Sequence, residues 1–164
     1  FFGGIAYPYG NIDVVPGIKK YYGGGANSLR AWQSHTLGPG TFTDTSATFN
    51  YAMEDLKLEA NFEARFDLFW ILEGAFFIDA GNIWAIKAVD KREAAKFKPL
   101  AFYNDIAIGT GLGVRFDFSF FVLRTDLGIK VRDPKISDGS RFIIANRKMK
   151  TNDFNFNIAI GYPF

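Results

Sequence analysis

Long stretches of strict alternation between apolar and polar residues are the feature that most constrains the fold of this chain. From Phe154 to Phe164 every second side chain is apolar, and asparagine, alanine, glycine and proline occupy the positions between them. A period of two places successive side chains on opposite faces of an extended strand. Four further segments repeat the pattern: residues 56–66, 70–80, 106–118 and 121–132. We therefore predict an all-β chain of antiparallel strands.

The charged side chains of these strands share one face. In residues 121–132, Arg124, Asp126 and Lys130 alternate with leucine, threonine and isoleucine. The strands of soluble sandwiches average about 5 or 6 residues, whereas these run for about 11 to 13, the length at which a tilted strand spans a bilayer. Aromatic residues gather at the strand ends, as in the girdle of a membrane barrel: Phe66, Phe69, Trp70, Phe116, Phe118, Phe120, Phe121 and Phe164. We predict a transmembrane antiparallel β-barrel of the bacterial outer membrane, with the lipid bilayer against its uncharged face.

Six strands are expected, joined by short turns on one side and long loops on the other. The strands are predicted at residues 1–10, 55–66, 70–81, 105–118, 120–132 and 153–164. Short turns at residues 67–69 and 119–120 are typical of the periplasmic side, so the long loop 11–54 is expected outside the cell. Residues 85–98, rich in Ala and Lys, are expected to form a short helix in a solvated loop. Because the smallest single-chain barrels have about eight strands, we interpret residues 1–164 as the C-terminal part of a larger barrel domain.

The composition gives little support to enzymatic or metal chemistry. The chain has no cysteine and one histidine, His35, whose loop offers no clear orienting acid for a catalytic pair. Glu59 and Glu63 lie on one face beside Lys57 and Arg65, which favours ion pairs in the lumen over the carboxylate pair of a glycosidase. A net charge of +2 gives no argument for a nucleic-acid partner. We predict neither an enzyme nor a metal or cofactor site.

The long loop carries the most specific motif. Leu29-Arg30-Ala31-Trp32 follows a glycine-rich run and precedes Leu37-Gly38-Pro39-Gly40. This arrangement resembles the Val/Leu-Arg-Gly/Ala-aromatic signature of the BamA/TamA superfamily of outer-membrane assembly and translocation barrels, and is similar to its TamL and BamA-like branches. Many members have Gly where this chain has Ala31.

Further matches follow in the family's order. Glu63 falls where the family has a strand-twelve glutamate. The run from Phe77 to Trp84 is similar to the Phe-x-Asp-x-Gly-x-x-Trp motif of strand thirteen, and the C-terminal strand ends in Gly161-Tyr162-Pro163-Phe164. The resemblance covers essentially the whole chain, as strands eleven to sixteen of a sixteen-stranded barrel.

The resemblance implies two functional features. The first is a loop folded back into the lumen and latched there by Arg30 against Asp79 and Glu63, since a guanidinium forks two hydrogen bonds to a carboxylate. Its residues are Leu29, Arg30, Ala31, Trp32, Glu63 and Asp79. The second is a seam beside the terminal strand, which opens and pairs with a client strand by β-augmentation. Its residues are Phe154, Phe156, Ile158, Ile160, Gly161 and Phe164.

The function implied by the resemblance is insertion or translocation of other proteins at the outer membrane. The expected partners are the outer-membrane lipid bilayer, client outer-membrane proteins and periplasmic or lipoprotein accessory subunits. A passive porin or solute channel is the alternative from another class. Secretion of one partner protein, as in two-partner systems, and phospholipid transport are alternatives within the superfamily.

Overall fold

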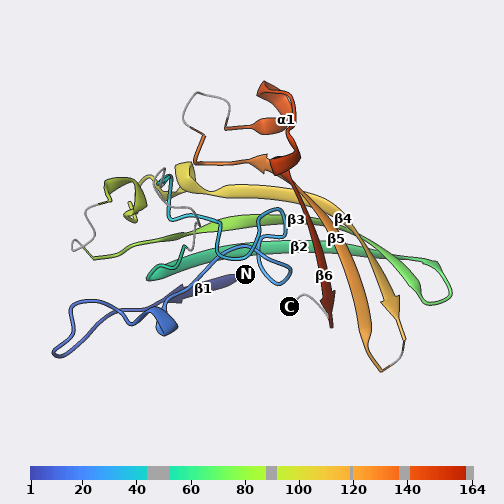
Figure 1. Ribbon diagram of the computed structural model, residues 1–164, viewed down its shortest axis with the longest axis horizontal. Coiled ribbons are helices and arrows are strands. Elements are labelled where there is room, and N and C mark those ends of the chain that lie inside the picture. The colour runs from blue at the N-terminus through green and yellow to red at the C-terminus, as the bar shows by residue number, and fades with distance from the viewer. Residues whose placement is uncertain (44–51, 88–91, 119, 137–140, 162–164) are drawn as a thin grey trace.

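The computed structural model describes residues 1–43, 52–87, 92–118, 120–136 and 141–161 and forms one curved antiparallel sheet (Figure 1). Its strands pair in chain order, each with the next. They are β1 (Phe2–Ile5), β2 (Leu56–Phe69), β3 (Leu72–Trp84), β4 (Ala107–Asp117), β5 (Val122–Arg132) and β6 (Phe154–Ile160). The helices are short: α1 (Ile143–Asn146) and the 3-10 turns η1 (Gly17–Lys19), η2 (Glu93–Ala95), η3 (Phe102–Asp105) and η4 (Thr151–Asp153). The all-β fold is the one predicted, and it is consistent with part of a β-barrel.

The strand ends differ from the prediction in two places. β1 ends at Ile5 rather than at residue 10, because Pro8 has no N–H to donate to a ladder and Gly10 takes a φ of 68°. β2 continues through the expected turn at 67–69. The chain reverses at the next residues instead, where Trp70 has a φ of 54°.

The remaining differences are small. The other strands lie within their predicted ranges or close to them, although β3 runs on to Trp84. Of the helix expected over 85–98, the described residues contain the single turn η2. The expected end of the last strand, at 162–164, lies outside the described residues.

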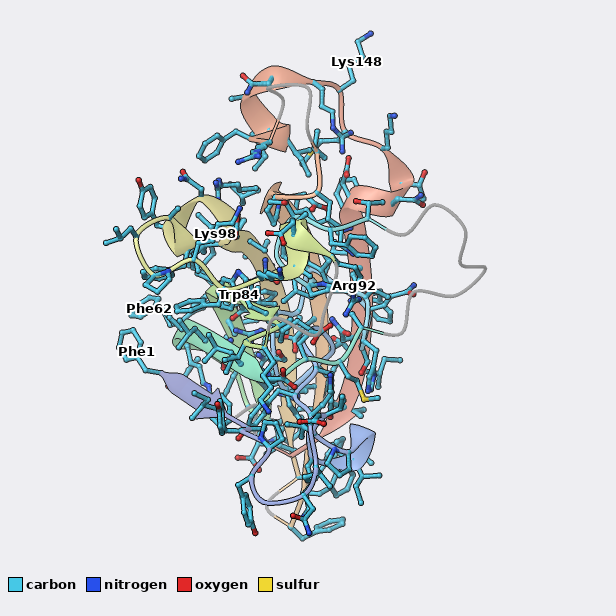
Figure 2. The ribbon with its side chains drawn as sticks, turned by 90° about the vertical axis from the view of Figure 1, so that its left-hand side faces the viewer. Phe1, Phe62, Trp84, Arg92, Lys98 and Lys148 are labelled. Carbon is cyan, nitrogen blue, oxygen red and sulfur yellow. The ribbon has the colours of Figure 1, made fainter. Side chains whose placement is uncertain are left out.

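Burial across the sheet is the reverse of that in a soluble protein. The apolar face is exposed: Leu112 shows 64% of its surface and Phe156 shows 62%, and Phe62 points outward (Figure 2). The charged face is enclosed, and Arg115 and Asp126 are completely buried. Charges are enclosed and hydrocarbon is exposed only where the outer medium is itself apolar. This arrangement supports lipid, rather than water or a second sheet, against the outer face.

The enclosed face is filled by the loop between β1 and β2. A small apolar cluster joins this loop to β4 and comprises Leu29, Ala31, Trp32, Leu37 and Ala107. In Figure 1 the loop lies across the middle of the sheet, next to β2 and β3. No helix in the described ranges is both long and apolar enough to cross a membrane.

The lipid-facing assignment predicts the effect of a charge at Leu112, midway along β4. Replacing it by Lys should lower the free energy of unfolding by about 2–4 kcal/mol, the cost of a cation at mid-bilayer depth. The measurement is denaturant unfolding of the full-length barrel in lipid vesicles. Leu112→Phe is the matched control and should change stability little; equal effects of the two substitutions would contradict the assignment.

Candidate functional site

The motif Leu29-Arg30-Ala31-Trp32 lies in a compact turn of the long loop. Two glycines, Gly24 and Gly25, take positive φ values of 89° and 92°, which other residues rarely adopt. The Gly25 N–H donates to the Trp32 carbonyl over 2.8 Å, and the Trp32 N–H donates to the Leu29 carbonyl over 3.1 Å. These bonds close the turn on itself and present the Arg30 side chain to the sheet.

Arg30 is completely buried and reaches β3 through three hydrogen bonds. Its backbone N–H and its Nε both donate to Oδ2 of Asp79, over 3.0 Å and 2.9 Å. Its Nη2 donates to Oδ1 of the same carboxylate over 2.9 Å. The ring of Phe77 lies 3.6 Å from the guanidinium carbon. This is a bidentate ion pair stacked on an aromatic face, a geometry that lysine cannot reproduce.

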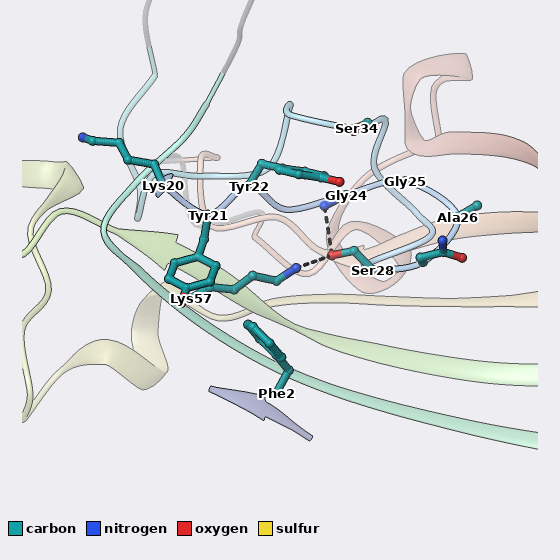
Figure 3. A pocket seen from close by; sticks show the side chains of 11 residues that line it. Phe2, Lys20, Tyr21, Tyr22, Gly24, Gly25, Ala26, Ser28, Ser34 and Lys57 are labelled. Carbon is teal, nitrogen blue, oxygen red and sulfur yellow. Dashed lines mark hydrogen bonds between the residues drawn. The ribbon is translucent and has the colours of Figure 1, made fainter. Parts of the chain in front are cut away.

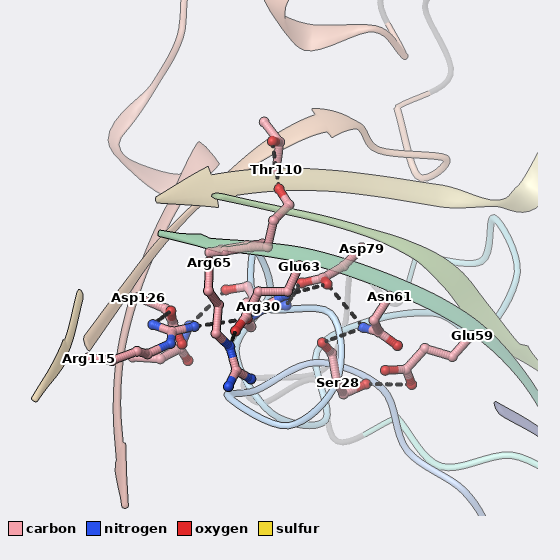
Figure 4. A network of polar contacts seen from close by, with 12 residues as sticks. Ser28, Arg30, Glu59, Asn61, Glu63, Arg65, Asp79, Thr110, Arg115 and Asp126 are labelled. Atoms are coloured by element: carbon pink, nitrogen blue, oxygen red, sulfur yellow. Dashed lines mark hydrogen bonds and ion pairs between the residues drawn. The ribbon is translucent and has the colours of Figure 1, made fainter. Parts of the chain in front are cut away.

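The third guanidinium nitrogen of Arg30 binds β2. Its Nη1 donates to Oε2 of Glu63, and the same oxygen accepts from Nη2 of Arg115 over 2.9 Å (Figure 4). Nη1 of Arg115 donates in turn to Asp126 over 2.6 Å. Arg65 completes the group by donating to Oε1 of Glu63 over 2.6 Å. The ion pairs therefore run from β2 to β5 through side chains of four strands and the loop.

The electrostatic balance keeps Arg30 charged. Burial alone would lower the pKa of Arg30, but hydrogen bonds and the negative charge from Asp79 and Glu63 outweigh it and raise that pKa. A buried cation needs this compensation, because an unpaired charge removed from water costs several kcal/mol. The carboxylates of Glu63 and Asp79 accept hydrogen bonds from guanidinium groups, so their role here is to anchor the loop.

A second set of contacts holds the other end of the motif. Ser28 donates to Glu59 over 2.9 Å and accepts from Lys57 over 3.1 Å, and Lys57 and Glu59 form an ion pair at 2.6 Å. Asn61 donates to the Ser28 carbonyl and to Asp79. Ser28 and Lys57 line a cavity of about 340 Å³ between the loop and the β1–β2 edge (Figure 3). The ion pairs predicted for Glu59 and Glu63 with their basic neighbours are present.

The carbonyl of Arg30 faces the opposite way, toward β6. It accepts from Nδ2 of Asn155 over 2.9 Å and from Nδ2 of Asn157 over 2.8 Å. Both asparagines lie on the charged, enclosed face of the terminal strand. The sequence prediction missed them, and the parity of the strand was the only available signal, since it placed them on the lumen side.

Glycines on β4 and β5 make room for the motif. A Cβ on Gly128 would lie 2.6 Å from the Arg30 carbonyl oxygen and 2.7 Å from the Ala31 nitrogen. A Cβ on Gly109 would lie 2.6 Å from the Cβ of Ala31. All three distances are shorter than real Cβ contacts, so the loop backbone lies directly on the sheet because these positions have no side chain.

The predicted site residues separate into two groups. Leu29, Ala31 and Trp32 are buried with Arg30 against the sheet, which brings the motif together with Glu63 and Asp79. The expected seam residues form the exposed outer face of the terminal strand: Phe154, Phe156, Ile158 and Ile160. Gly161 follows them with a φ of 95° and donates to the Val122 carbonyl, whereas Phe164 lies outside the described residues. Among the described residues no group of three metal-ligating side chains is found.

The ion pairs predict that Asp79→Asn releases the loop. The substitution keeps the shape of the side chain but leaves Arg30 without its main counter-charge, which should weaken loop docking by about 3–5 kcal/mol. Trypsin should then cleave after Arg30, which is inaccessible in the native protein. Cleavage after the exposed Lys19 serves as an internal standard.

The matched control for this experiment is Asp67→Asn, an exposed carboxylate near the far end of β2. It should leave the tryptic pattern unchanged. Full protection of Arg30 in Asp79→Asn would show that Asp79 does not hold the loop.

Comparison with known proteins identifies the family of the chain. Over 101 residues the chain is 31% identical to the outer membrane protein assembly factor BamA of Neisseria meningitidis serogroup B, a stretch covering 56% of this chain and 12% of that relative. The chain thus corresponds to a small part of the length of that relative. No solved structure matches it. The sequence profile of the Omp85 superfamily domain matches residues 2–164. Because this match spans almost the entire chain, the protein belongs to the Omp85 superfamily, whose members are bacterial outer-membrane proteins of the BamA/TamA type.

Proposed function

We propose that this chain is the C-terminal barrel portion of a factor that assembles or translocates other proteins at the outer membrane. The observation that carries the proposal is the buried Arg30, which joins a long loop to carboxylates of β2 and β3 inside the curved sheet. A loop seated by ion pairs against the inner face is a controllable element, because these polar contacts add to one small apolar cluster and can form or break as a group.

The loop argues against the passive porin. An open solute channel needs a water-filled lumen with accessible charges, whereas here Arg30 is enclosed and paired with Asp79, and Arg115 is enclosed and paired with Glu63. Trp32, with 2% of its surface exposed, covers a further part of the inner face. The resident loop occupies the face that would otherwise line the channel.

The terminal strand supplies the second part of the proposal. β6 pairs with β5 along one edge, from Phe154 to Ile160, and its other edge would face a further strand of the full barrel or a client strand. A free edge offers unpaired backbone N–H and C=O groups to an incoming strand, and this pairing places little demand on the client's side chains. In the full barrel this edge would form one side of the seam through which clients enter the bilayer.

Its partners would be the lipid bilayer, client outer-membrane proteins and periplasmic or lipoprotein accessory subunits. The proposed reaction is strand pairing and insertion, without cofactor or covalent chemistry.

The first test is Arg30→Ala in the full-length protein. The barrel should still insert, but the loop should detach and client assembly should slow about tenfold or more, since each 1.4 kcal/mol of lost interaction is a factor of ten. Arg30→Lys keeps the charge without the fork and should give an intermediate rate. Client assembly is measured as the appearance of heat-sensitive folded porin in vesicles that contain the variant. Assembly at the native rate by Arg30→Ala would remove the loop from the mechanism.

The seam is tested separately by cross-linking. One cysteine replaces Ala159 on β6 and a second is placed on the strand that faces β6 in the full barrel. The disulfide should stop client assembly, and a reductant should restore it, because a closed edge cannot pair with a client strand. A pair of cysteines joining Thr125 and Ile158, which already face each other across β5 and β6, is the control and should leave assembly unaffected. Undiminished assembly by the cross-linked seam variant would favour transport through the lumen, as in a porin or a two-partner secretion pore.

A further inference from the structure

The Arg30 carbonyl is an acceptor shared by two side chains of the terminal strand. Asn155 is buried and Asn157 is partly buried, and both donate their amide N–H to this one oxygen at 2.9 Å and 2.8 Å. Nδ2 of Asn155 also lies 3.2 Å from Oδ1 of Asn157, so the two side chains form a connected pair. We refer to Asn155, Asn157 and the Arg30 carbonyl as the amide clamp.

The clamp connects strands that are not neighbours. The side chain and N–H of Arg30 bind β2 and β3, while its carbonyl binds β6. In the sheet β3 and β6 are separated by β4 and β5. A single residue of the loop therefore connects β2 and β3 with β6 across the concave side of the sheet.

Two glycines of the sheet fix how close the loop backbone lies to β4 and β5. Gly128 on β5 lies under the Arg30 carbonyl, with no space for a Cβ between them. Gly109 on β4 lies in the same way under Ala31. Because the loop backbone rests on β4 and β5, its carbonyl is held at the level at which the asparagines of β6 reach it.

We propose that Asn155 and Asn157 are positioning residues that make the placement of the terminal strand depend on the seating of the loop. With the ion pairs of Arg30 intact, the carbonyl is fixed and β6 is held by the clamp as well as by β5. When the ion pairs break, the carbonyl moves away and β6 keeps only its ladder with β5. The significance of this coupling for client entry rests on the proposed function, but the coupling itself is a property of the protein alone.

The test is amide hydrogen exchange of the full-length protein in lipid nanodiscs without any client. The peptide covering 154–160 reports on β6, the peptide covering 107–117 reports on β4, and the peptide covering 23–33 reports on the loop. In the double variant Asn155→Ala, Asn157→Ala the exchange of β6 should rise about tenfold or more, as expected for the loss of two hydrogen bonds. The β4 peptide, which is paired on both edges, should not change.

The decisive variant is Asp79→Asn, since Asp79 lies on β3 and two strands, β4 and β5, separate β3 from β6. It should raise the exchange of both the loop and β6 but leave β4 unchanged. Added to the double asparagine variant, it should raise the exchange of β6 no further. A local structural role of the two asparagines would not produce this remote and non-additive effect.

Two further variants complete the design. Gly128→Ala, opposite Asn155 in the ladder of β5 with β6, displaces the carbonyl while both asparagines are kept and should reproduce the rise in β6. Asn152→Ala, an exposed position in η4 just before β6, is the matched control and should have no effect. If the double variant does not give a barrel with heat-shifted mobility, Asn157→Ala alone is used in its place.

The inference is overturned if Asp79→Asn releases the loop while the exchange of β6 stays at the native value. It is also overturned if the hydrogen exchange of β4 rises together with that of β6. Since no client is present, either result leaves the proposed assembly function standing, and a protein inactive in assembly could still show the coupling.

Discussion

Burial of the Arg30 guanidinium is the constraint on which the rest of this structure depends. Removing a cation from water is costly, and that cost is offset only where carboxylates are already in position. Here the carboxylates come from β2 and β3, while the cation comes from a loop that precedes both strands. Removing Asp79 would leave Arg30 buried without its main counter-charge, so the loop and the strands stabilise each other. Docking of the loop is therefore linked to the correct alignment of β2 with β3, which pairs Asn61 with Asp79 and Glu63 with Phe77.

The same electrostatic reasoning explains how charge is distributed between the two faces. In lipid a charged side chain must point toward the lumen, where Arg115 and Asp126 neutralise each other at 2.6 Å. A lumen lined only by long charged side chains would keep the loop away from the sheet. The glycines of β4 and β5 solve this problem, because they bring the loop backbone into direct contact with the strands at Gly109 and Gly128. The charged residues of this face thus attract the loop, and its glycines leave the space in which the loop backbone lies.

Much of this arrangement could be predicted from the sequence, because the period of two assigns each side chain to a face. The parity placed Glu63, Asp79 and Arg115 inside and Leu112 outside, as observed, and the motif around Arg30 pointed to the carboxylates that it binds. The alternation tells which face of the sheet a residue lies on, but it does not tell where a loop lies against that face. For this reason the contacts of Asn155 and Asn157 with a backbone carbonyl, 125 and 127 residues away in the chain, could not be inferred. The early end of β1 depended on local turn geometry at Pro8 and Gly10, which alternation does not encode.

The terminal strand shows why these contacts matter together. Among the described residues its ladder with β5 joins seven residue pairs, from Leu123–Ile160 to Ile129–Phe154, whereas β4 and β5 are joined by ten. Its outer face is apolar and exposed, with Ile160 at 75%, so lipid contact gives no fixed position along the sheet. The asparagines of its inner face bind the loop instead. The terminal strand is therefore tied to the Arg30 carbonyl, and the ion pairs that bury a cation at one side of the sheet also determine how firmly the other side is held.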